Sequence, residues 1–254
     1  MTASIPIVIK DNENIIRSTL SSIQLQKDID FEVIVIDDNS SDYSAEIVYN
    51  EFCKKDHRIK LFSNICRGSL DAYNTANRLC TGEYILKIYP GMILNKNYMQ
   101  AFLAYMEHNP HISAVSSRVI YKKMAAAGYM EDDSSTYVPS ILEIDQFNND
   151  NSLIVNKFDI WTQYATCFKR ETMLKYDIQA RSANAPAYTF WTEFWSNCCN
   201  MAIISSTMMA FFLNCGNNVE NIVLDNEVKF YVENACTRYM QHTGRLISYG
   251  GNTE

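Results

Sequence analysis

The 254-residue sequence predicts an α/β fold, a mostly parallel central sheet with helices on both faces and an irregular C-terminal half. Three observations predict it. Apolar segments of strand length alternate with amphipathic helical segments through the first 121 residues. The strand segments are mainly apolar throughout, as in sheets that are covered on both faces. The alternation then stops, and turn-rich or aromatic-rich segments replace it.

The first half supplies the strands and helices of this sheet in strict alternation. We expect strands over residues 4–9, 31–36, 58–62, 83–88 and 112–121. In the first intervening segment, Ile16, Leu20 and Ile23 recur at helical spacing and form one apolar face. We expect helices over residues 12–26, 44–52, 69–80 and 97–109. Elements in this order form parallel βαβ units with right-handed crossovers.

The second half begins with a polar, turn-rich stretch at residues 122–140, which we interpret as a mobile loop or a lid. It contains the acidic run Glu131-Asp132-Asp133, which we expect in a solvated loop. Residues 201–213 are the most apolar stretch of the chain. A transmembrane helix needs about 20 apolar residues, so this stretch is too short, and we expect a buried pair of strands.

The remaining segments predict no further domain. We expect a short helix near residues 170–176 and a helical tail over residues 226–241. The sequence has no internal repeat and no clean linker. We therefore expect one domain over residues 1–254, with a first half at 1–121 and a second half at 122–254.

Composition excludes several classes of function. The net charge is −7, and an acidic chain repels phosphate backbones, so we expect no nucleic-acid partner. The eight cysteines show no C-x-x-C spacing, and Pro110 separates His108 from His111, so neither set predicts a metal site. The N-terminus has no signal-peptide pattern. We expect a cytoplasmic protein with reduced thiols, and peripheral contact with the inner face of a membrane stays open.

In a sheet of this kind, ligands bind outside the carboxyl ends of the parallel strands. The segments that follow the first four strands are residues 9–12, 37–42, 63–68 and 87–92. The last of them is unusual, because its loop Tyr89-Pro90-Gly91-Met92 carries no carboxylate.

Two longer stretches carry a family resemblance. Residues 12–64 place a helix before a strand that ends in DDNSSD at 37–42, an Asp-Asp-x-Ser-x-Asp pattern. Residues 67–88 continue with a glycine turn, an Asn-containing helix and TGEYI before the next strand. In combination these features resemble the family 2 glycosyltransferases, which have the GT-A fold. The resemblance covers residues 5–120, and the second half matches only loosely.

The resemblance implies an enzyme that moves a sugar from a nucleotide diphosphate, such as a UDP-sugar, to a saccharide or lipid-linked acceptor with inversion. The first half would bind the donor and the second half the acceptor. In the family the acidic residue after the second strand contacts the base, which points to Asp38. A carboxylate can accept the imide N–H of uracil. An Asp of this turn can also cap the helix that starts near Ser44, and the two roles are compatible.

Other donor-binding candidates follow from the same resemblance. They are Ile9, Asp11, Arg67, Lys87 and Tyr89. Ile9 and Asp11 lie in the turn after the first strand, which lacks the proline and tyrosine usual in the family. The residue before Asn74 is a tyrosine where the family commonly has an arginine.

The metal-binding Asp-x-Asp of the family falls on Tyr89-Pro90-Gly91 when the chains are aligned on TGEYI. Neither carboxylate is present, and a hard cation needs oxygen ligands. We therefore expect no cofactor and no metal at this loop. Mg²⁺ or Mn²⁺ would bind only if the motif lay elsewhere in the chain.

A lysine in the preceding strand offers a replacement charge. Strand alternation places Ile85, Lys87 and Tyr89 on one face, with Lys87 near the ligand end. Lys87 could stabilise a diphosphate with help from Arg67. It could equally extend to solvent or pair with a nearby acid.

The family often places an acidic catalytic residue in a motif that opens a helix of the second half. Glu193, in Thr192-Glu193-Phe194-Trp195, is the best match here. As a base it would take the proton of the acceptor hydroxyl. Trp191 and Trp195, four residues apart, could pack against a sugar face or within the core.

Two functions of different classes remain open. The first is a glycosyltransferase that works without a metal or only weakly. The second is a catalytically inactive relative that binds a ligand or acts as a scaffold for a partner glycosyltransferase, and a homo-oligomer is also open. The missing Asp-x-Asp favours the second, whereas Asp38 and Glu193 favour the first.

Overall fold

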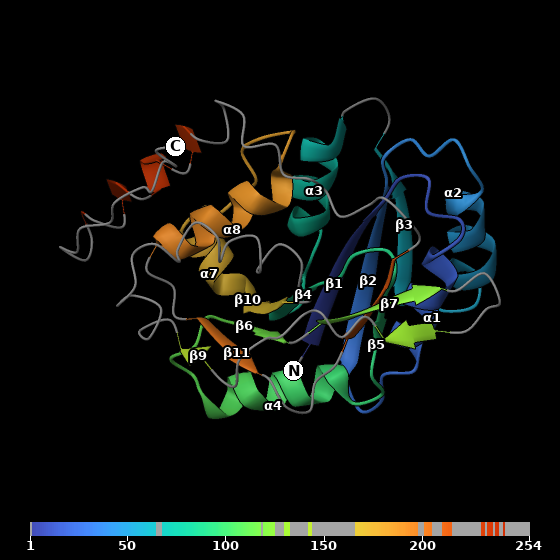
Figure 1. The fold of residues 1–254 in the computed structure, drawn as a ribbon, viewed down its shortest axis with the longest axis horizontal. Coiled ribbons are helices and arrows are strands. Elements are labelled where there is room, and N and C mark those ends of the chain that lie inside the picture. Colours follow the sequence, from blue (N-terminus) through green and yellow to red (C-terminus); the bar gives the residue numbers. More distant parts are fainter. Residues whose placement is uncertain are drawn as a thin grey trace.

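The structure is a computed structural model. It describes residues 2–64, 68–117, 119–124, 130–132, 142–143, 166–197, 201–204 and 210–214, together with residues 230–231, 233–235, 237–238 and 241. Figure 1 shows a central sheet flanked by helices, with the strands β1 and β2 running from the N-terminus toward the upper part of the molecule. Within these residues, no helix combines the length and the apolar character that crossing a membrane requires.

The larger sheet has the strand order β3-β2-β1-β4-β10-β6-β11-β9 in the described residues. Its strands are β1 (Thr2–Ile9), β2 (Asp30–Asp37), β3 (Ile59–Ser63), β4 (Tyr84–Lys87), β6 (Ala114–Ser117), β9 (Leu142–Glu143), β10 (Thr166–Lys169) and β11 (Met201–Ile204). The strands β3, β2, β1 and β4 pair in parallel, which confirms the predicted βαβ units. The first half of the chain therefore builds a block of four adjacent parallel strands.

Helices cover both faces of this sheet, as predicted. They are α1 (Ile16–Gln24), α2 (Ser44–Ile47) with the π-helical continuation η1 (Val48–Cys53), α3 (Gly68–Arg78), α4 (Tyr98–His108), α7 (Arg170–Lys175) and α8 (Pro186–Ser196). One core joins the sheet to α1, α2, η1 and α4, and the other joins it to α3, α7 and α8. The described residues of the predicted helical tail are also helical.

The strand β2 shows why these segments are apolar almost throughout. Val33 and Val35 belong to the core beneath α1, whereas Ile34 and Ile36 belong to the core beneath α3 and α8. Successive side chains of a strand point to opposite faces, so a strand that is covered on both sides needs apolar residues at every position.

A smaller sheet corrects one predicted strand. Residues 112–121 do not form a single strand, because β6 belongs to the larger sheet and β7 (Val119–Met124) to the smaller one. The smaller sheet has the order β5-β12-β7-β8, with β5 (Met92–Leu94), β8 (Met130–Asp132) and β12 (Ala210–Asn214). Residues 201–213 do supply two strands, but β11 and β12 lie in different sheets. An apolar pattern marks strands without showing where the chain changes sheet.

The acidic run is a second correction. Glu131 and Asp132 lie in β8, and the prediction of a solvated loop was wrong for them, while Asp133 lies outside the described residues. In the antiparallel register, Lys122 is opposite Asp132 and Lys123 is opposite Glu131. This polar segment thus forms a strand by pairing with β7.

The amino ends of the parallel strands are held together by Glu32. Its Oε1 accepts hydrogen bonds from Ser4 Oγ at 2.8 Å and from Thr81 N at 2.8 Å, and its Oε2 accepts one from Lys60 Nζ at 3.0 Å. Beside this carboxylate, a Cβ on Gly82 would lie 2.8 Å from the backbone of Ala3. The Thr-Gly of the TGEYI motif therefore serves packing at the amino end of the sheet.

Candidate functional site

The carboxyl ends of β1, β2 and β3 meet at one level, where Ile9 pairs with Asp37 and Asp37 pairs with Ser63. The ladder continues one residue further, because Asp38 N donates to Ile9 O at 2.9 Å and Asn64 N donates to Asp37 O at 2.8 Å. Asp38 and Asn64 are thereby placed side by side at this edge. Ile9 itself is fully buried beneath them.

The carboxylate of Asp38 is held by a hydrogen bond from Asn64 and lies near the ammonium group of Lys10. Asn64 Nδ2 donates to Asp38 Oδ1 at 2.7 Å and also to Gly68 O at 3.0 Å. Lys10 Nζ lies 3.8 Å from Asp38 Oδ2, and its side chain is 63% exposed. The Asp38 side chain is itself only 4% exposed. At 3.8 Å the contact is too long for a hydrogen bond, so Lys10 does not use Oδ2 as an acceptor.

Asn64 was not among the predicted site residues. The available signal was its position, since it directly follows β3 within the loop segment 63–68. Gly68, its second acceptor, begins α3 with a φ of +80°, and a Cβ there would meet nothing within 4 Å. The glycine is therefore required by backbone conformation and not by crowding.

The loops after β1 and β2 bind each other through reciprocal hydrogen bonds, and we call residues 10–13 and 40–44 the β1–β2 loop pair. Asp11 Oδ1 accepts from Ser41 N at 2.7 Å and from Ser41 Oγ at 2.9 Å, which lowers the pKa of Asp11. In return, Asp11 N donates to Ser40 Oγ at 3.2 Å. Asp11, predicted to bind the donor, is thus engaged in holding the second loop.

The same loop pair supports the start of α2. Asp42 Oδ1 accepts from Ser44 N at 2.9 Å, and Asp42 Oδ2 accepts from Glu13 N at 2.9 Å. Tyr43 N donates to Glu13 Oε2 at 3.1 Å. The helix-supporting role expected for this turn therefore falls to Asp42, while Asp38 faces the edge of the sheet.

The loop Tyr89-Pro90-Gly91, at which the sequence resemblance predicts the family's Asp-x-Asp position, is a tight turn packed on α1. Gly91 has a φ of +95°, and Met92 N donates to Tyr89 O at 3.0 Å across the turn. Gly91 N donates to Thr19 Oγ1 at 2.8 Å, and Leu94 N donates to Ser22 Oγ at 3.0 Å. Tyr89 is half-buried between the two cores. Within the described residues, no group of three His, Cys, Asp or Glu side chains is placed to hold a metal.

Lys87 lies inside the layer between the sheet and α3. It is 3% exposed, donates to Asn77 Oδ1 at 2.7 Å and lies 3.6 Å from the centre of the Tyr73 ring. Burial lowers the pKa of Lys87 to about 7. Lys87 thus contacts an amide and an aromatic ring. The predictions that it extends to solvent or pairs with an acid were wrong. The prediction that Lys87 and Ile85 share one face of the strand is confirmed, since Ile85 packs in the same core as the Tyr73 ring.

The strand register places Lys87 below the carboxyl edge. Ser4 pairs with Ile85, so Lys87 is level with Pro6. That is three residues short of Ile9, or about 10 Å along the strand. Lys87 is therefore not brought together with Asp38. Arg67, the other cation predicted near this edge, lies outside the described residues.

Glu193 does not open a helix, which corrects the predicted placement. The helix α8 begins at Pro186, a residue favoured in the first turn, and Glu193 is its eighth residue. Glu193 is 7% exposed. Its Oε1 lies 2.8 Å from Arg238 Nη2 and 3.8 Å from Arg181 Nε. The carboxylate is thus enclosed by two arginines that the sequence did not single out.

Trp191 is a core residue. It is 1% exposed, and its ring packs edge-on against Phe168 at 5.6 Å and against Phe190 at 5.1 Å. Of the two roles open for this tryptophan, core packing is confirmed. The side chain of Trp195 lies outside the described residues.

The segment that leads into α8 lies along the beginning of α3. Asn74 Nδ2 donates to Ala180 O at 3.0 Å, and Ala180 N donates to Asn74 Oδ1 at 2.9 Å. Nearer the carboxyl edge, Ser69 Oγ donates to Ala183 O at 3.1 Å. Asn74, part of the family-like helix, therefore joins the two halves of the chain.

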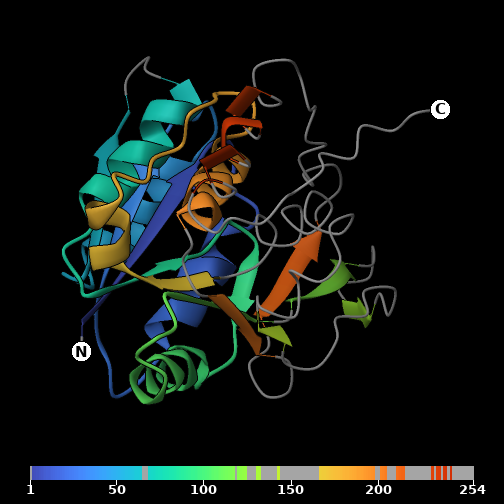
Figure 2. The same cartoon turned by 90° about the vertical axis from the view of Figure 1, so that its left-hand side faces the viewer.

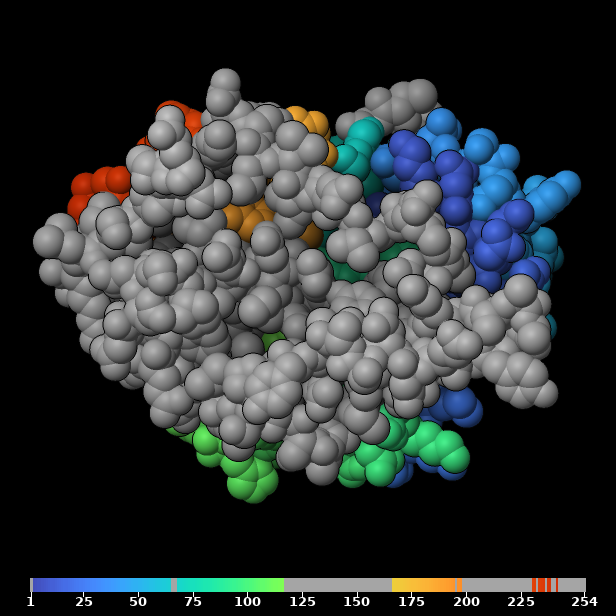
Figure 3. Space-filling model, in the orientation of Figure 1, coloured from blue at the N-terminus to red at the C-terminus, as the bar shows by residue number. Residues whose placement is uncertain are grey.

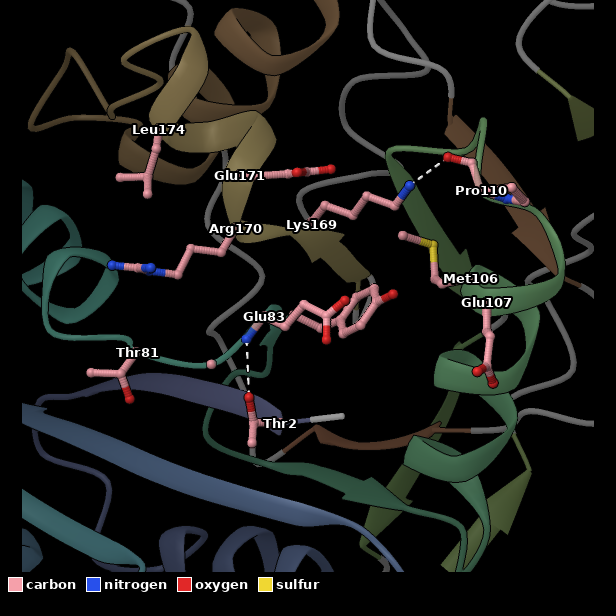
Figure 4. A pocket seen from close by; sticks show the side chains of 12 residues that line it. Thr2, Thr81, Glu83, Met106, Glu107, Pro110, Lys169, Arg170, Glu171 and Leu174 are labelled. Carbon is pink, nitrogen blue, oxygen red and sulfur yellow. Dashed lines mark hydrogen bonds between the residues drawn. The ribbon is translucent and has the colours of Figure 1, made fainter.

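A hollow of about 700 Å³ lies at the opposite end of the strands, as Figure 4 shows. It is lined by residues from the starts of β1 and β4, including Thr2 and Tyr84, and by Lys169, Arg170 and Glu171. Lys169 Nζ donates to Pro110 O across it. Because it is at the amino ends of the strands, it is distinct from the predicted site. Figure 3 shows segments of the first 80 residues, in blue and teal, meeting on the surface at the other end.

Comparison with known proteins identifies the relatives of this fold. The family model "Glycosyl transferase family 2" matches residues 4–170. An uncharacterized glycosyltransferase of Rickettsia bellii (strain RML369-C) is 31% identical over 118 residues, which are 46% of this chain and 16% of that protein. This chain thus spans less than a fifth of the length of that relative.

Solved structures show the same fold. TarS of S. aureus, in a complex with UDP-GlcNAc, matches with a TM-score of 0.66 at 17% identity, over 95% of this chain and 73% of TarS. The mannosyltransferase PcManGT of Pyrobaculum calidifontis, in a complex with GDP-Man and Mn²⁺, matches with a TM-score of 0.60 at 16% identity, over 97% of this chain and 65% of PcManGT. These matches confirm the predicted GT-A fold. Since the family model also covers well over half of the chain, the protein belongs to glycosyl transferase family 2.

Proposed function

We propose that this protein transfers a sugar from a nucleotide diphosphate to a saccharide or lipid-linked acceptor, with inversion at the anomeric carbon. The observation that carries the proposal is the Asp38–Asn64 pair at the carboxyl edge of the parallel strands. The family relationship supports it, because TarS and PcManGT have been solved with UDP-GlcNAc and GDP-Man respectively. A cytoplasmic location, with or without peripheral contact to a membrane, is part of the proposal.

Asp38 is proposed to read the base. Asn64 occupies Oδ1 and fixes the plane of the carboxylate, so Oδ2 is the oxygen that would accept the imide N–H of a uracil. Lys10 is the exposed cation that the base would displace from Oδ2. The first half, residues 1–121, would thus bind the donor, and residues 122–254 the acceptor, within one domain.

The transfer itself is proposed to be a single displacement. The acceptor oxygen forms a bond to C1 as the bond from C1 to the diphosphate oxygen breaks. The electron pair leaves with the diphosphate, and a base takes the hydroxyl proton. We propose Glu193 as that base, a role that its two arginine partners constrain.

The reaction is proposed to proceed without a metal. This rests on the proposed equivalence of the family's metal loop with the turn Tyr89-Pro90-Gly91, which offers no carboxylate. Its Gly91 N–H is already bound to Thr19 on α1. The residues present do not fit a hard divalent cation, so no step is routed through one.

The same loop favours a second candidate function. A family member without the Asp-x-Asp can retain the fold and act as a binding or scaffold partner of another glycosyltransferase, or in a homo-oligomer. That alternative predicts no transfer and no need for an intact carboxylate at position 38.

Calorimetric titration separates the two candidates. The ligands titrated are UDP, UDP-GlcNAc and GDP-mannose. We expect a ligand that binds to have the same affinity with and without Mn²⁺. Asp38→Asn should weaken binding by about tenfold or more, because a charged acceptor is lost. Asp30→Asn is the matched control, since Asp30 is an exposed carboxylate at the other end of β2.

Product analysis completes this test. NMR of the product should show an inverted anomeric configuration. A protein that binds no nucleotide leaves only the scaffold function. Binding that requires Mn²⁺ contradicts the metal-free reaction.

A further inference from the structure

We propose that Arg181 and Arg238 are the cations that bind the diphosphate of the donor, and that Glu193 is their counterion while no donor is bound. This inference rests on the proposed function, because it assigns the part of the site that holds the leaving group. It goes beyond that function by naming the groups that replace the family's metal.

The need for such cations follows from charge. The diphosphate gains negative charge as its bond to C1 breaks, and an environment without opposite charge disfavours that step. The turn Tyr89-Pro90-Gly91 supplies no ligand for a metal that could provide it. Arginine matches phosphate well, because its planar guanidinium presents several N–H donors in a fixed arrangement.

The cluster carries more positive than negative charge, as the binding of an anion requires. Both arginines approach the same oxygen of Glu193, so two positive charges face one negative charge. The Arg238 Nε is buried and has no hydrogen-bond partner among the described residues. The side chains of Arg181 and Arg238 are 36% and 39% exposed, so both remain accessible to a ligand. The cluster thus has surplus charge and donors that Glu193 does not use.

A chain of contacts leads from the base-binding residue to this cluster. Asn64 joins Asp38 to Gly68 at the start of α3. The next residue, Ser69, binds Ala183 in the segment that contains Arg181. Figures 1 and 2 both show the C-terminal helical residues, in red, lying beside α8 at the end toward which β1 and β2 run.

The other described cations near the strands are less suitable. Lys87 is enclosed between Asn77 and Tyr73, below the edge. Lys169 and Arg170 line the hollow at the amino ends of the strands. Lys10 is at the edge but faces Asp38.

The arrangement implies an exchange of partners on binding. The guanidinium groups leave the Glu193 carboxylate and bind the diphosphate oxygens. Glu193 then has no counterion and can accept the proton of the acceptor hydroxyl, while the electron pair of the broken C1–O bond goes to the diphosphate. Donor binding would thereby activate the base.

The test compares UDP with uridine, which shares the base and ribose but lacks the diphosphate. We expect Arg181→Met and Arg238→Met each to weaken UDP binding by about tenfold, since each removes a charge-assisted interaction, and to leave uridine binding unchanged. Arg17→Met is the matched control, because Arg17 forms a comparable pair with Glu51 at 2.7 Å on the surface. It should affect neither ligand.

A third variant tests the counterion role without removing a cation. Glu193→Gln should strengthen UDP binding several-fold while it abolishes transfer. Arg238→Lys keeps the charge and should retain part of the affinity for UDP. It replaces Arg238→Met in the comparison if that variant folds poorly. Equal losses of UDP and uridine binding, or unchanged UDP binding in both methionine variants, overturn the inference. A wild-type protein that binds neither ligand rejects the proposed function itself.

Discussion

At the scale of single residues, Lys87 is a lysine buried between the sheet and a helix. A lysine between a sheet and a helix must either lose its charge or be held by a partner. Asn77 and the Tyr73 ring provide only neutral partners. Burial accordingly lowers the pKa of Lys87 from 10.5 to about 7. This has a definite consequence for the dependence of stability on pH.

We expect Lys87→Met to stabilise the protein at neutral pH. The unfolded lysine binds a proton up to about pH 10.5 and the folded one only up to about pH 7, so wild-type stability rises between these values. The loss of the Asn77 hydrogen bond offsets part of the gain, which leaves roughly 2 kcal/mol near neutral pH. Urea unfolding from neutral to alkaline pH should show this advantage disappearing.

The control for this prediction is Lys96→Met, an exposed lysine whose replacement should leave the pH dependence unchanged. A constant stability difference between Lys87→Met and the wild type at every pH would contradict the titration of Lys87. The substitution also tests the sequence-based prediction that Lys87 contacts the diphosphate, which its buried position disfavours. If Lys87 binds the diphosphate, Lys87→Met should weaken UDP binding, whereas a purely internal lysine predicts no change.

At the scale of elements, α1 does more than cover the sheet. Two of its side chains, Thr19 and Ser22, and Gln26 just after the helix form hydrogen bonds with the backbone of residues 91 to 99. Buried N–H groups need partners, and here a helix supplies them to a short strand. The turn at Gly91 is therefore held in place by α1.

We expect Ser22→Ala to destabilise the protein by about 1–2 kcal/mol, because Leu94 N–H then loses its acceptor in a buried site. Ser21→Ala is the matched control, one residue away on the exposed side of the same helix. It should change stability by less than about 0.5 kcal/mol. Thermal unfolding measures both, and equal effects would mean that the hydrogen bond to β5 is not important.

Periodicity in the sequence was sufficient for most of these elements. The helices α1, α2 with η1, α3 and α4 and the strands β1 to β4 were predicted because each has its own local pattern. In β2, for example, residues 33–36 are all apolar because alternate side chains enter the two cores. The change of sheet between β6 and β7 was not predictable, because residues 112–121 have the length of one strand and contain no glycine or proline that would mark a break. The strand β8 was missed because its partner β7 lies in a separate segment of the chain, which no local pattern in residues 130–132 indicates.

At the scale of the whole molecule, two connections tie distant parts of the chain together. The strand β10 enters between β4 and β6 and runs antiparallel to both. Arg181 and Arg238 meet at Glu193 from different segments. Neither arrangement has a local signature, so the sequence predicted the acidic residue Glu193 without its partners. The position of Asp38 at the carboxyl edge, by contrast, was predictable because Asp38 directly follows a strand within a recognisable pattern.

The carboxylate of Glu32 joins four segments at the amino end of the sheet, and we expect it to govern part of the stability in acid. Burial alone would raise its pKa, but hydrogen bonds from Thr81, Lys60 and Ser4 outweigh this and lower it from 4.5 to about 2. Its contribution is present above about pH 4.5 and is lost as the pH falls toward about 2.

Acid unfolding of Glu32→Gln tests this expectation. The variant should be less stable than the wild type at neutral pH, and the difference should shrink as the pH falls from about 4.5 to about 2. Glu46→Gln, at an exposed position of α2, should follow the wild-type curve. A difference that stays constant through this range would mean that Glu32 has an ordinary pKa in the folded protein.

The β1–β2 loop pair has a consequence for the thermodynamics of recognition. Backbone N–H groups of Ser41, Asp11, Asn12 and Glu13 are bound within the loop pair by Asp11, Ser40, Ser44 and Asp42 respectively. A ligand that docks beside Asp38 therefore does not have to order these loops, and little conformational entropy is lost. Binding of the free nucleoside should accordingly show only a small negative heat-capacity change, because little apolar surface is newly buried.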